Sequence, residues 1–333
     1  MTSLTLLILV VIVALAFDFV NGFHDTANAI ATVVSTGAMR ARNAIILASV
    51  CNVIGAFMGT AVAKTLGKDI LDPALISQSV VLCALLGAIA WNLLTWYFGI
   101  PSSSSHALVG GMVGAGMVAV GPSAIKAEGV EKVVTALIVS PLFGFSVAFL
   151  LMVFWMWTIR RTRPRVSNRV FRLLQLPSAA FLALSHGLND AQKTMGVITM
   201  ALMSYHGTYD AHAEFPVPDW VVFACAIAMG LGTAVGGWRI IHTMGNKIFK
   251  LEPVHGFTSS IAAALVIQGA SFYGLPISTT HCITTSIMGA GATKRLSAVR
   301  WGVTRKIVGA WILTIPCAAA VSAVCYLVLG PLL

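Results

Sequence analysis

The chain has 333 residues, of which 58% are hydrophobic and only 10% are charged, and its formal net charge is +10. A soluble domain of this size carries about 25% charged residues, so this composition excludes an ordinary water-soluble globule and a disordered chain. It also excludes a nucleic-acid-binding domain despite the positive charge, because the basic residues lie in short loops between long apolar runs. At roughly 20 apolar residues per helix, the chain can supply about ten to twelve membrane passes.

The apolar runs follow one another along the whole sequence, and each is predicted to form a helix. They cover residues 4–36, 43–63, 75–100, 102–120, 133–158, 173–204, 220–242, 256–274, 277–293 and 307–330. Because most of them are long enough to cross a hydrocarbon core, the sequence predicts an all-α polytopic membrane protein.

The loops between these runs differ in charge. Segment 160–172 holds six arginines and no acidic residue, and loops 40–42, 247–252 and 294–306 are also basic, whereas 205–219 holds three acidic residues and no Lys or Arg. Short basic loops stay in the cytoplasm. We therefore predict a multi-pass protein of the cytoplasmic (inner) membrane with ten net crossings and both termini outside. The sequence leaves open whether the segments around 99–106 and 274–281 form full crossings or half-crossing hairpins.

Two motifs occur twice, in the same order. Residues 21–25 (NGFHD) align with 186–190 (HGLND), and residues 99–106 (GIPSSSSH) align with 274–281 (GLPISTTH). A weaker similarity joins 59–62 to 232–235, both GTAV.

The repeat divides the chain into a first half, 1–158, an Arg-rich cytoplasmic linker, 159–172, and a second half, 173–333. The charge assignment makes the halves run in opposite directions. Inverted-topology repeats with broken or re-entrant helices, meeting at a site near the membrane midplane, are typical of secondary transporters.

Runs 4–36 and 173–204 would each be about 50 Å long as single helices, longer than one crossing needs. We expect both to be broken or re-entrant near Gly22 and Gly187. A simple tilt is the alternative.

Charged residues inside apolar runs are costly and mark transport pathways by default. On a helix, Asp18, Asn21, Asp25 and Asn28 share one stripe, and His186, Asn189, Asp190 and Lys193 repeat the pattern. Carboxylate and amide oxygens suit a hard cation or a proton. We assign ion coupling to Asp25, Asn28, Asp190 and Lys193, with Asn21 and Asn189 in support. The alternative is hydrogen bonding between packed helices.

The repeated Pro-Ser/Thr segments predict two helix starts, because Pro favours the first turn and Ser or Thr the N-cap. Two such ends facing the interior would offer N–H groups and hydroxyls to a tetrahedral oxyanion. The hydroxyls belong to Ser103, Ser104, Ser105, Ser278, Thr279 and Thr280. His106 and His281 could donate to the anion, relay protons or orient the loop. Capping alone is the alternative.

No enzymatic motif stands beside these features. The sequence lacks a phosphate-binding GxxxxGK[ST] loop and HExxH, and its six cysteines have no metal-type spacing. We expect no enzyme activity, no bound metal, no cofactor and no disulfide framework.

With both motif pairs in view, the sequence resembles the PiT family of inorganic phosphate transporters over nearly its whole length. The resemblance implies an inverted-repeat membrane fold, phosphate symport and a homodimer, and a cytosolic regulatory partner by analogy. It also implies that Asp25 and Asp190 serve ion coupling while the Ser/Thr hydroxyls hold phosphate.

One departure from the family pattern concerns the coupling ion. Sodium-coupled relatives carry an Asp-x-Ala-Asn type motif in both halves, whereas here Lys193 stands where Asn28 stands in the first half. An ammonium group cannot ligate sodium, so we favour protons, with sodium as the alternative.

We therefore predict import of inorganic phosphate, either free or as a neutral metal–phosphate complex, by alternating access in which one half rocks against the other. A sulfate transporter and an anion channel are the alternative functions.

Overall fold

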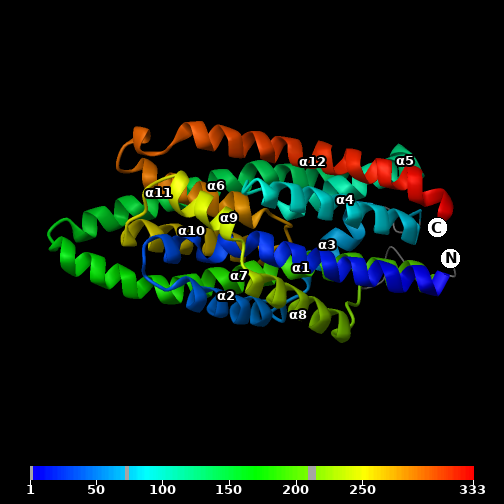
Figure 1. The fold of residues 1–333 in the computed structure, drawn as a ribbon, viewed down its shortest axis with the longest axis horizontal. Helices are drawn as coiled ribbons and strands as arrows, with labels where there is room; N and C mark the ends of the chain where they lie inside the picture. Colours follow the sequence, from blue (N-terminus) through cyan, green and yellow to red (C-terminus); the bar gives the residue numbers. More distant parts are fainter. Residues whose placement is uncertain (1–2, 72–74, 209–214) are drawn as a thin grey trace.

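The computed structural model describes residues 3–71, 75–208 and 215–333, and forms an elongated bundle of helices with both chain ends at the same end of the long axis (Figure 1). Beside the helices, the described segments contain one isolated antiparallel bridge, between Leu71 and Ile125. The predicted all-α class is confirmed.

The first half consists of a long helix, a bent pair, a helical hairpin and a second long helix. These are α1 (Ser3–Ser35), α2 (Ala41–Ala56) with α3 (Ala61–Asp69), α4 (Gln78–Tyr97) with α5 (Ser104–Ala119), and α6 (Ala127–Ile159). The bend between α2 and α3 is 72°.

The second half repeats this order of elements. They are α7 (Pro164–His206), α8 (Asp219–Val235) with α9 (Trp238–His242), α10 (Pro253–Phe272) with α11 (Thr279–Ala292), and α12 (Trp301–Leu329). Segment Trp238–Lys247 is bent by 61° from α8. Helix α1 begins at the end of the molecule that carries the termini, whereas α7 begins at the opposite end and runs back (Figure 1).

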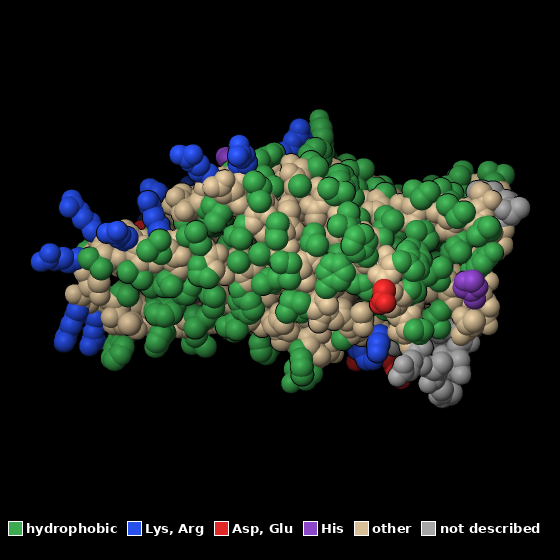
Figure 2. Space-filling view, turned by 90° about the horizontal axis from the view of Figure 1, so that it is seen from below, with side chains coloured by type: hydrophobic (Ala, Val, Ile, Leu, Met, Phe, Trp, Pro, Cys, Tyr) green, Lys and Arg blue, Asp and Glu red, His purple; other side chains and the backbone are tan. Residues whose placement is uncertain are grey.

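The surface is that of a protein surrounded by lipid. Within the described segments, four helices qualify as membrane spans by length and apolar composition, or up to six if each bent pair counts as one span. Large apolar side chains such as Leu142 and Leu150 on α6 are exposed. Figure 2 shows apolar side chains along the body, while Lys and Arg gather at the end opposite the termini. Helices suit such surroundings because they satisfy their own backbone groups.

The expected breaks at Gly22 and Gly187 are wrong, because α1 and α7 are each continuous helices. These glycines instead allow close helix crossings. A Cβ at Gly22 would lie 2.4 Å from the carbonyl oxygen of Met229 on α8, and one at Gly187 would lie 2.2 Å from that of Asn52 on α2. Both crossings join a helix of one half to a helix of the other.

The re-entrant elements are the hairpins. The backbone N–H of Lys126, after α5, donates to the oxygen of Ile70, before α4, at 3.0 Å. The N–H of Arg300, after α11, donates to that of Ile248, before α10, at 2.9 Å. The two ends of each hairpin therefore lie side by side, at the same end of the bundle.

The prediction of ten net crossings is consequently wrong, because it counted each hairpin as two crossings. Without the hairpins, each half retains two long helices and one bent pair, an odd number of passages. The second half therefore still starts at the opposite end of the molecule from the first.

Two further expectations need correction. Segment 160–172 is a loop only over residues 160–163, since α6 ends at Ile159 and α7 begins at Pro164. The weak GTAV similarity is not structural, because Gly59 lies between α2 and α3 whereas Gly232 lies inside α8. Gly55 is the counterpart of Gly232: a Cβ at either would lie within about 2.2 Å of a backbone oxygen across the crossing.

The two halves interlace. Helix α12 packs on the α4–α5 hairpin of the first half, and α6 packs on the α10–α11 hairpin of the second. Each hairpin is therefore held by the long helix that ends the other half.

Candidate functional site

The repeated Pro-Ser/Thr segments form the tips of the two hairpins. Gly99 and Gly274 end the incoming helices with φ of +64° and +67°, a conformation that favours glycine. The outgoing helices α5 and α11 are then capped alike, because Ser103 Oγ accepts from the His106 N–H at 3.3 Å and Ser278 Oγ from the His281 N–H at 3.1 Å. The predicted helix starts are present in both halves.

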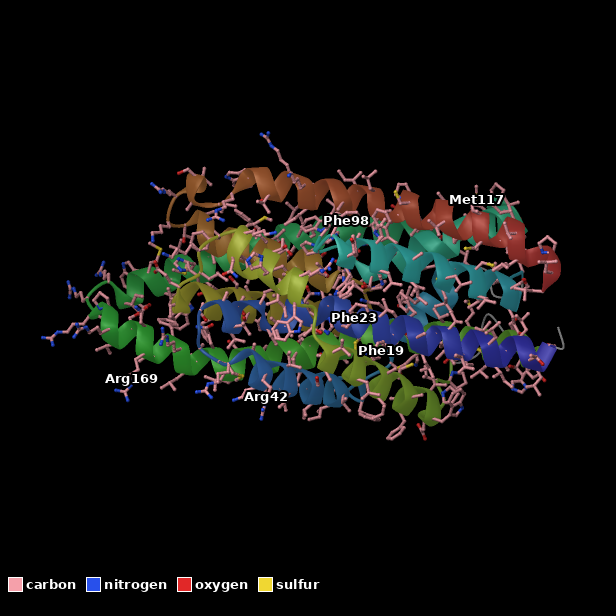
Figure 3. The ribbon with its side chains drawn as sticks, in the orientation of Figure 1. Phe19, Phe23, Arg42, Phe98, Met117 and Arg169 are labelled. Atoms are coloured by element: carbon pink, nitrogen blue, oxygen red, sulfur yellow. The ribbon has the colours of Figure 1, made fainter. Side chains whose placement is uncertain are left out.

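The two tips meet inside the bundle. Ser105 Oγ donates to the carbonyl oxygen of Ile277 at 3.3 Å, and the rings of His106 and His281 lie 4.9 Å apart. Figure 3 places Phe98, at the end of α4, near the middle of the long axis, above Phe23 of α1. The two hairpins enter the bundle from opposite ends of the molecule, and the N-termini of α5 and α11, at their tips, meet near mid-length.

Asp25 on α1 lies at this meeting point, buried, with donors from several elements. It accepts a hydrogen bond from Nδ1 of His24 at 2.6 Å. Thr280 of the second hairpin donates to Oδ1 at 3.3 Å, and Ser104 of the first hairpin to Oδ2 at 3.5 Å. One carboxylate therefore contacts both tips.

Asp190 is its counterpart on α7. Lys193 Nζ lies 2.5 Å from Oδ1, and Thr279 of the second hairpin donates to Oδ2 at 3.3 Å. Both members of the ion pair are fully buried. The charge of Asp190 is therefore balanced within one turn of α7, whereas the donors to Asp25 come from several elements.

His186 joins the two carboxylates. Its Nε2 lies 3.4 Å from Oδ2 of Asp190 and 4.0 Å from Oδ2 of Asp25. One ligand atom from each of the three residues falls within 4.8 Å of the others, which is close enough to surround a single cation. Asn28 adds an amide to the same cluster and donates to Thr280 Oγ1 at 2.9 Å and to Thr279 Oγ1 at 3.3 Å.

The structure thus brings together seven of the residues predicted from the sequence: Asp25, Asn28, Ser104, Asp190, Lys193, Thr279 and Thr280. Others lie beside this cluster without touching the carboxylates. The hydroxyls of Ser103 and Ser278 cap their own helices, and Ser105 binds the opposite tip.

The predicted supporting residues surround the cluster. Asn189 Nδ2 donates to Ser271 Oγ at 2.9 Å. Neither polar atom of the buried Asn21 side chain has a hydrogen-bond partner within the described segments, and the same holds for the ring nitrogens of His106 and His281. Trp311 of α12 stacks on His281 at 3.9 Å and donates its indole N–H to the oxygen of Pro101 at 2.9 Å.

Sequence reasoning did not assign a site role to three contacting residues. His24 contacts Asp25 and also lies 3.1 Å from Thr95 Oγ1, and His186 lies between the carboxylates. Asn52 of α2 lies 3.2 Å from Nδ1 of His186 and donates to Thr233 of α8 at 2.9 Å. Both histidines stand inside the duplicated motif, which was a usable signal, and Asn52 is a polar residue inside an apolar run.

The hydrogen bonds between hydroxyls and carboxylates in this cluster could be replaced by bonds to bound ions. The hydroxyls of Ser104, Thr279 and Thr280 donate to carboxylates over 3.3 to 3.5 Å, long for such bonds. The same hydroxyls and the first N–H groups of α5 and α11 are suited to an oxyanion. The carboxylates could accept a proton or a cation at the same place.

A membrane-embedded helical bundle, in which two opposed hairpins meet at a buried cluster of charges and hydroxyls, defines the class of secondary transporters. Comparisons with known proteins identify the group within that class. A model of the phosphate transporter family matches residues 21–170 and again residues 159–322. The chain belongs to the phosphate transporter family, and the protein is a transporter, not an enzyme.

Relatives match over almost the full length. The chain is 49% identical to the probable low-affinity inorganic phosphate transporter of Bacillus subtilis over 98% of both chains, and 50% identical to that of Rhizobium meliloti over 96% of both. Among solved structures, the sodium-dependent phosphate transporter matches with a TM-score of 0.91 at 26% identity, covering 99% of this chain and all of that one.

Proposed function

We propose that this protein imports inorganic phosphate across the cytoplasmic membrane by proton-coupled symport. The observation that carries the proposal is the meeting of hydroxyls from the hairpin tips with Asp25 of one half and Asp190 of the other. Such a site can hold an oxyanion and a positively charged companion together. The names of the relatives, low-affinity inorganic phosphate transporters, support phosphate as the anion.

Within this proposal, the phosphate oxygens are held by Ser104, Thr279 and Thr280, with Ser103, Ser105 and Ser278 shaping the tips. Asp25 and Asp190 accept a hydrogen bond from protonated phosphate, a contact that sulfate, which lacks that proton, cannot make. Competition by sulfate at equal concentration would contradict this assignment.

Protons are favoured over sodium because of Lys193. Its ammonium lies 2.5 Å from Asp190, so a fixed positive charge already occupies the place where a second cation would sit. In the first half the equivalent residue is Asn28, whose side-chain oxygen has no hydrogen-bond partner among the described residues. Sodium stays the alternative, and the name of the sodium-dependent structural relative supports it.

A metal–phosphate complex is an alternative form of the cargo, and one observation favours it. Asp25, His186 and Asp190 offer ligand atoms within 4.8 Å of one another, so they could surround the metal of such a complex. The test is uptake of labelled phosphate with and without a chelator: if the complex is the cargo, chelation stops uptake, and if free phosphate is carried, it does not.

Orientation and organisation are part of the proposal. The basic end of the molecule faces the cytoplasm, which places both termini outside (Figure 2). The repeats are 1–158 and 173–333, joined by 159–172, and the two separate matches of the family model support this division. The homodimer and a cytosolic regulatory partner rest on the family resemblance.

For alternating access, motion of the hairpins is an alternative to the expected rocking of one half against the other. Because α1 packs on α8 and α2 on α7 through glycines without room for a Cβ, rocking would separate both crossings. We place the motion in the hairpins, each of which enters from one end of the molecule and reaches the site with its tip.

The proposal is tested with purified protein in liposomes, in which pH and sodium gradients are set independently. We expect an inward proton gradient alone to drive accumulation of labelled phosphate above equilibrium. Accumulation driven by sodium alone would refute proton coupling. Equilibration without accumulation under both gradients would indicate a channel.

A further inference from the structure

The cluster at the hairpin tips leaves one buried carboxylate unused. Asp18 lies on α1, two turns before Asp25 and thus about 10 Å away along the helix. It is 0% exposed, and neither carboxylate oxygen has a hydrogen-bond partner in the described part of the chain. Asp25 and Asp190, by contrast, each accept hydrogen bonds from several groups.

In the described part of the chain, the residues that surround Asp18 offer it no cation of its own. From α7, Thr194 faces it, and Asp190 and Lys193 are the charged groups close enough to interact. From α8, the nearest titratable group is the thiol of Cys225. Helix α4, which also packs on α1, contains no Asp, Glu, Lys, Arg or His. Among the described residues, the ammonium that interacts with Asp18 is that of Lys193, which is already paired with Asp190.

A buried carboxylate that is faced by a single hydroxyl, that of Thr194, and has no cation of its own is very costly to keep ionised in an apolar interior. Protonation removes the charge. We propose that Asp18 binds the proton that is transported with phosphate; this inference rests on the proposed proton symport and names the group that takes the proton.

The same geometry connects Asp18 to the substrate site. While Asp18 is protonated and neutral, Lys193 stays with Asp190, whose Oδ2 accepts a hydrogen bond from Thr279 of the hairpin tip at 3.3 Å. When the proton leaves, the Asp18 carboxylate competes with Asp190 for the same ammonium. Proton occupancy therefore changes the charge that Asp190 presents to the tip.

The position of Asp18 fits uptake from outside. Because α1 starts at the end that carries the termini, Asp18 lies nearer to that end than Asp25 does (Figure 1). Its neighbour Phe19 is likewise nearer to that end than Phe23 (Figure 3). In the proposed orientation this is the external side, from which the proton arrives.

The experiment compares wild type, Asp18→Asn, Asp18→Glu and Asp219→Asn in liposomes. Asp219, at the exposed start of α8, provides the same chemical change away from the site. Two reactions are measured for each: phosphate–phosphate exchange without a gradient, and phosphate accumulation driven by a pH gradient. An infrared spectrum of each purified protein reports the C=O band of a protonated carboxyl group.

We expect Asp18→Asn to keep exchange and lose accumulation, Asp18→Glu to keep both, and Asp219→Asn to match wild type. The carboxylic acid band should be present in wild type and absent from Asp18→Asn. Accumulation by Asp18→Asn, or loss of exchange together with accumulation in a variant that elutes as folded protein, would overturn the inference. If wild type itself does not respond to a pH gradient, the failure is that of the proposed proton symport, and the infrared comparison still shows whether Asp18 holds a proton.

Discussion

The ammonium of Lys193 and the carboxylate of Asp190 form a fully buried ion pair, 2.5 Å apart and one turn from each other on α7. Removing one partner of a buried pair leaves an uncompensated charge and costs ~3–5 kcal/mol, whereas replacing both is far less costly. We therefore expect Lys193→Met to lower the thermal unfolding temperature in detergent strongly. The double variant Asp190→Asn/Lys193→Met should recover most of the lost stability without recovering uptake. Equal stability of the single and double variants would mean that the pair contributes nothing.

A second substitution at this position concerns ion choice. Lys193→Asn gives the second motif the Asp-x-x-Asn pattern of Asp25 and Asn28, and replaces an ammonium that repels sodium by an amide oxygen that can ligate it. We expect phosphate uptake by this variant to become stimulated by sodium at fixed pH, measured in liposomes. Lys193→Met, which supplies no oxygen, serves as the control. No sodium stimulation in Lys193→Asn would argue that Lys193 does not set the ion preference.

Asp25 is predicted to be required for coupling. It is the acceptor for His24, Ser104 and Thr280, so it connects α1 to both hairpin tips. Asp25→Asn keeps the size of the side chain and removes the charge. We expect accumulation of phosphate under a pH gradient to fall to the level of empty liposomes. Accumulation at a rate near that of wild type would remove Asp25 from the mechanism.

The hydroxyl of Thr280 is predicted to bind phosphate. A hydrogen bond to a charged group contributes ~1.5–3 kcal/mol, and each 1.4 kcal/mol is tenfold in affinity. Thr280→Val should thus raise the half-saturating phosphate concentration by roughly tenfold or more. Thr158→Val is the matched control, because that hydroxyl donates only to its own helix on an exposed surface of α6. An unchanged half-saturating concentration would limit Thr280 to a structural contact.

Gly187 is predicted to be needed for helix packing rather than for flexibility. An added Cβ would lie 2.2 Å from the backbone oxygen of Asn52, so α7 and α2 would have to separate. Overpacking of this kind costs ~1–3 kcal/mol, and we expect Gly187→Ala to unfold at a lower temperature. Gly302→Ala on α12 is the control, since no atom lies within 4 Å of the added Cβ. If both variants melt alike, the close crossing does not limit stability.

Local rules explain why the hairpin tips could be predicted from the sequence. A Ser at the N-cap and a duplicated motif act over a few residues, and the structure has the two caps at Ser103 and Ser278 as expected. The expectation of Pro in the first turn is wrong, because Pro101 and Pro276 each lie two residues before the cap. The carboxylates were found for an equally local reason, because a charge inside an apolar run is conspicuous.

The path of the chain could not be obtained in the same way. A hairpin that enters and leaves at one end returns the chain to the same side as two full crossings do, so loop charges fit either path. What distinguishes them is tertiary: the contact of Lys126 with Ile70, and that of Arg300 with Ile248. The composition of α4 gives no warning, since it is long and apolar enough to be a span.

The prediction that α1 and α7 are broken rested on the length of each apolar run compared with one membrane crossing, and length alone does not distinguish a broken helix from a continuous one. A glycine in a long helix can mark a break or a close crossing, and the sequence does not say which. Only the partner helix, α8 for Gly22 and α2 for Gly187, decides.

Trp311 belongs to α12 yet contacts both hairpins: its indole N–H donates to Pro101 of one tip, and its ring lies flat on His281 of the other. A single side chain thus contacts both hairpin tips, the elements in which we place the motion of alternating access. If one hairpin tip moves away from the site, Trp311 loses its contact with that tip and keeps its contact with the other. The surroundings of Trp311 therefore depend on which tip has moved. Because the chain contains eight tryptophans, the fluorescence of Trp311 reports that change only in a variant in which the other seven are replaced.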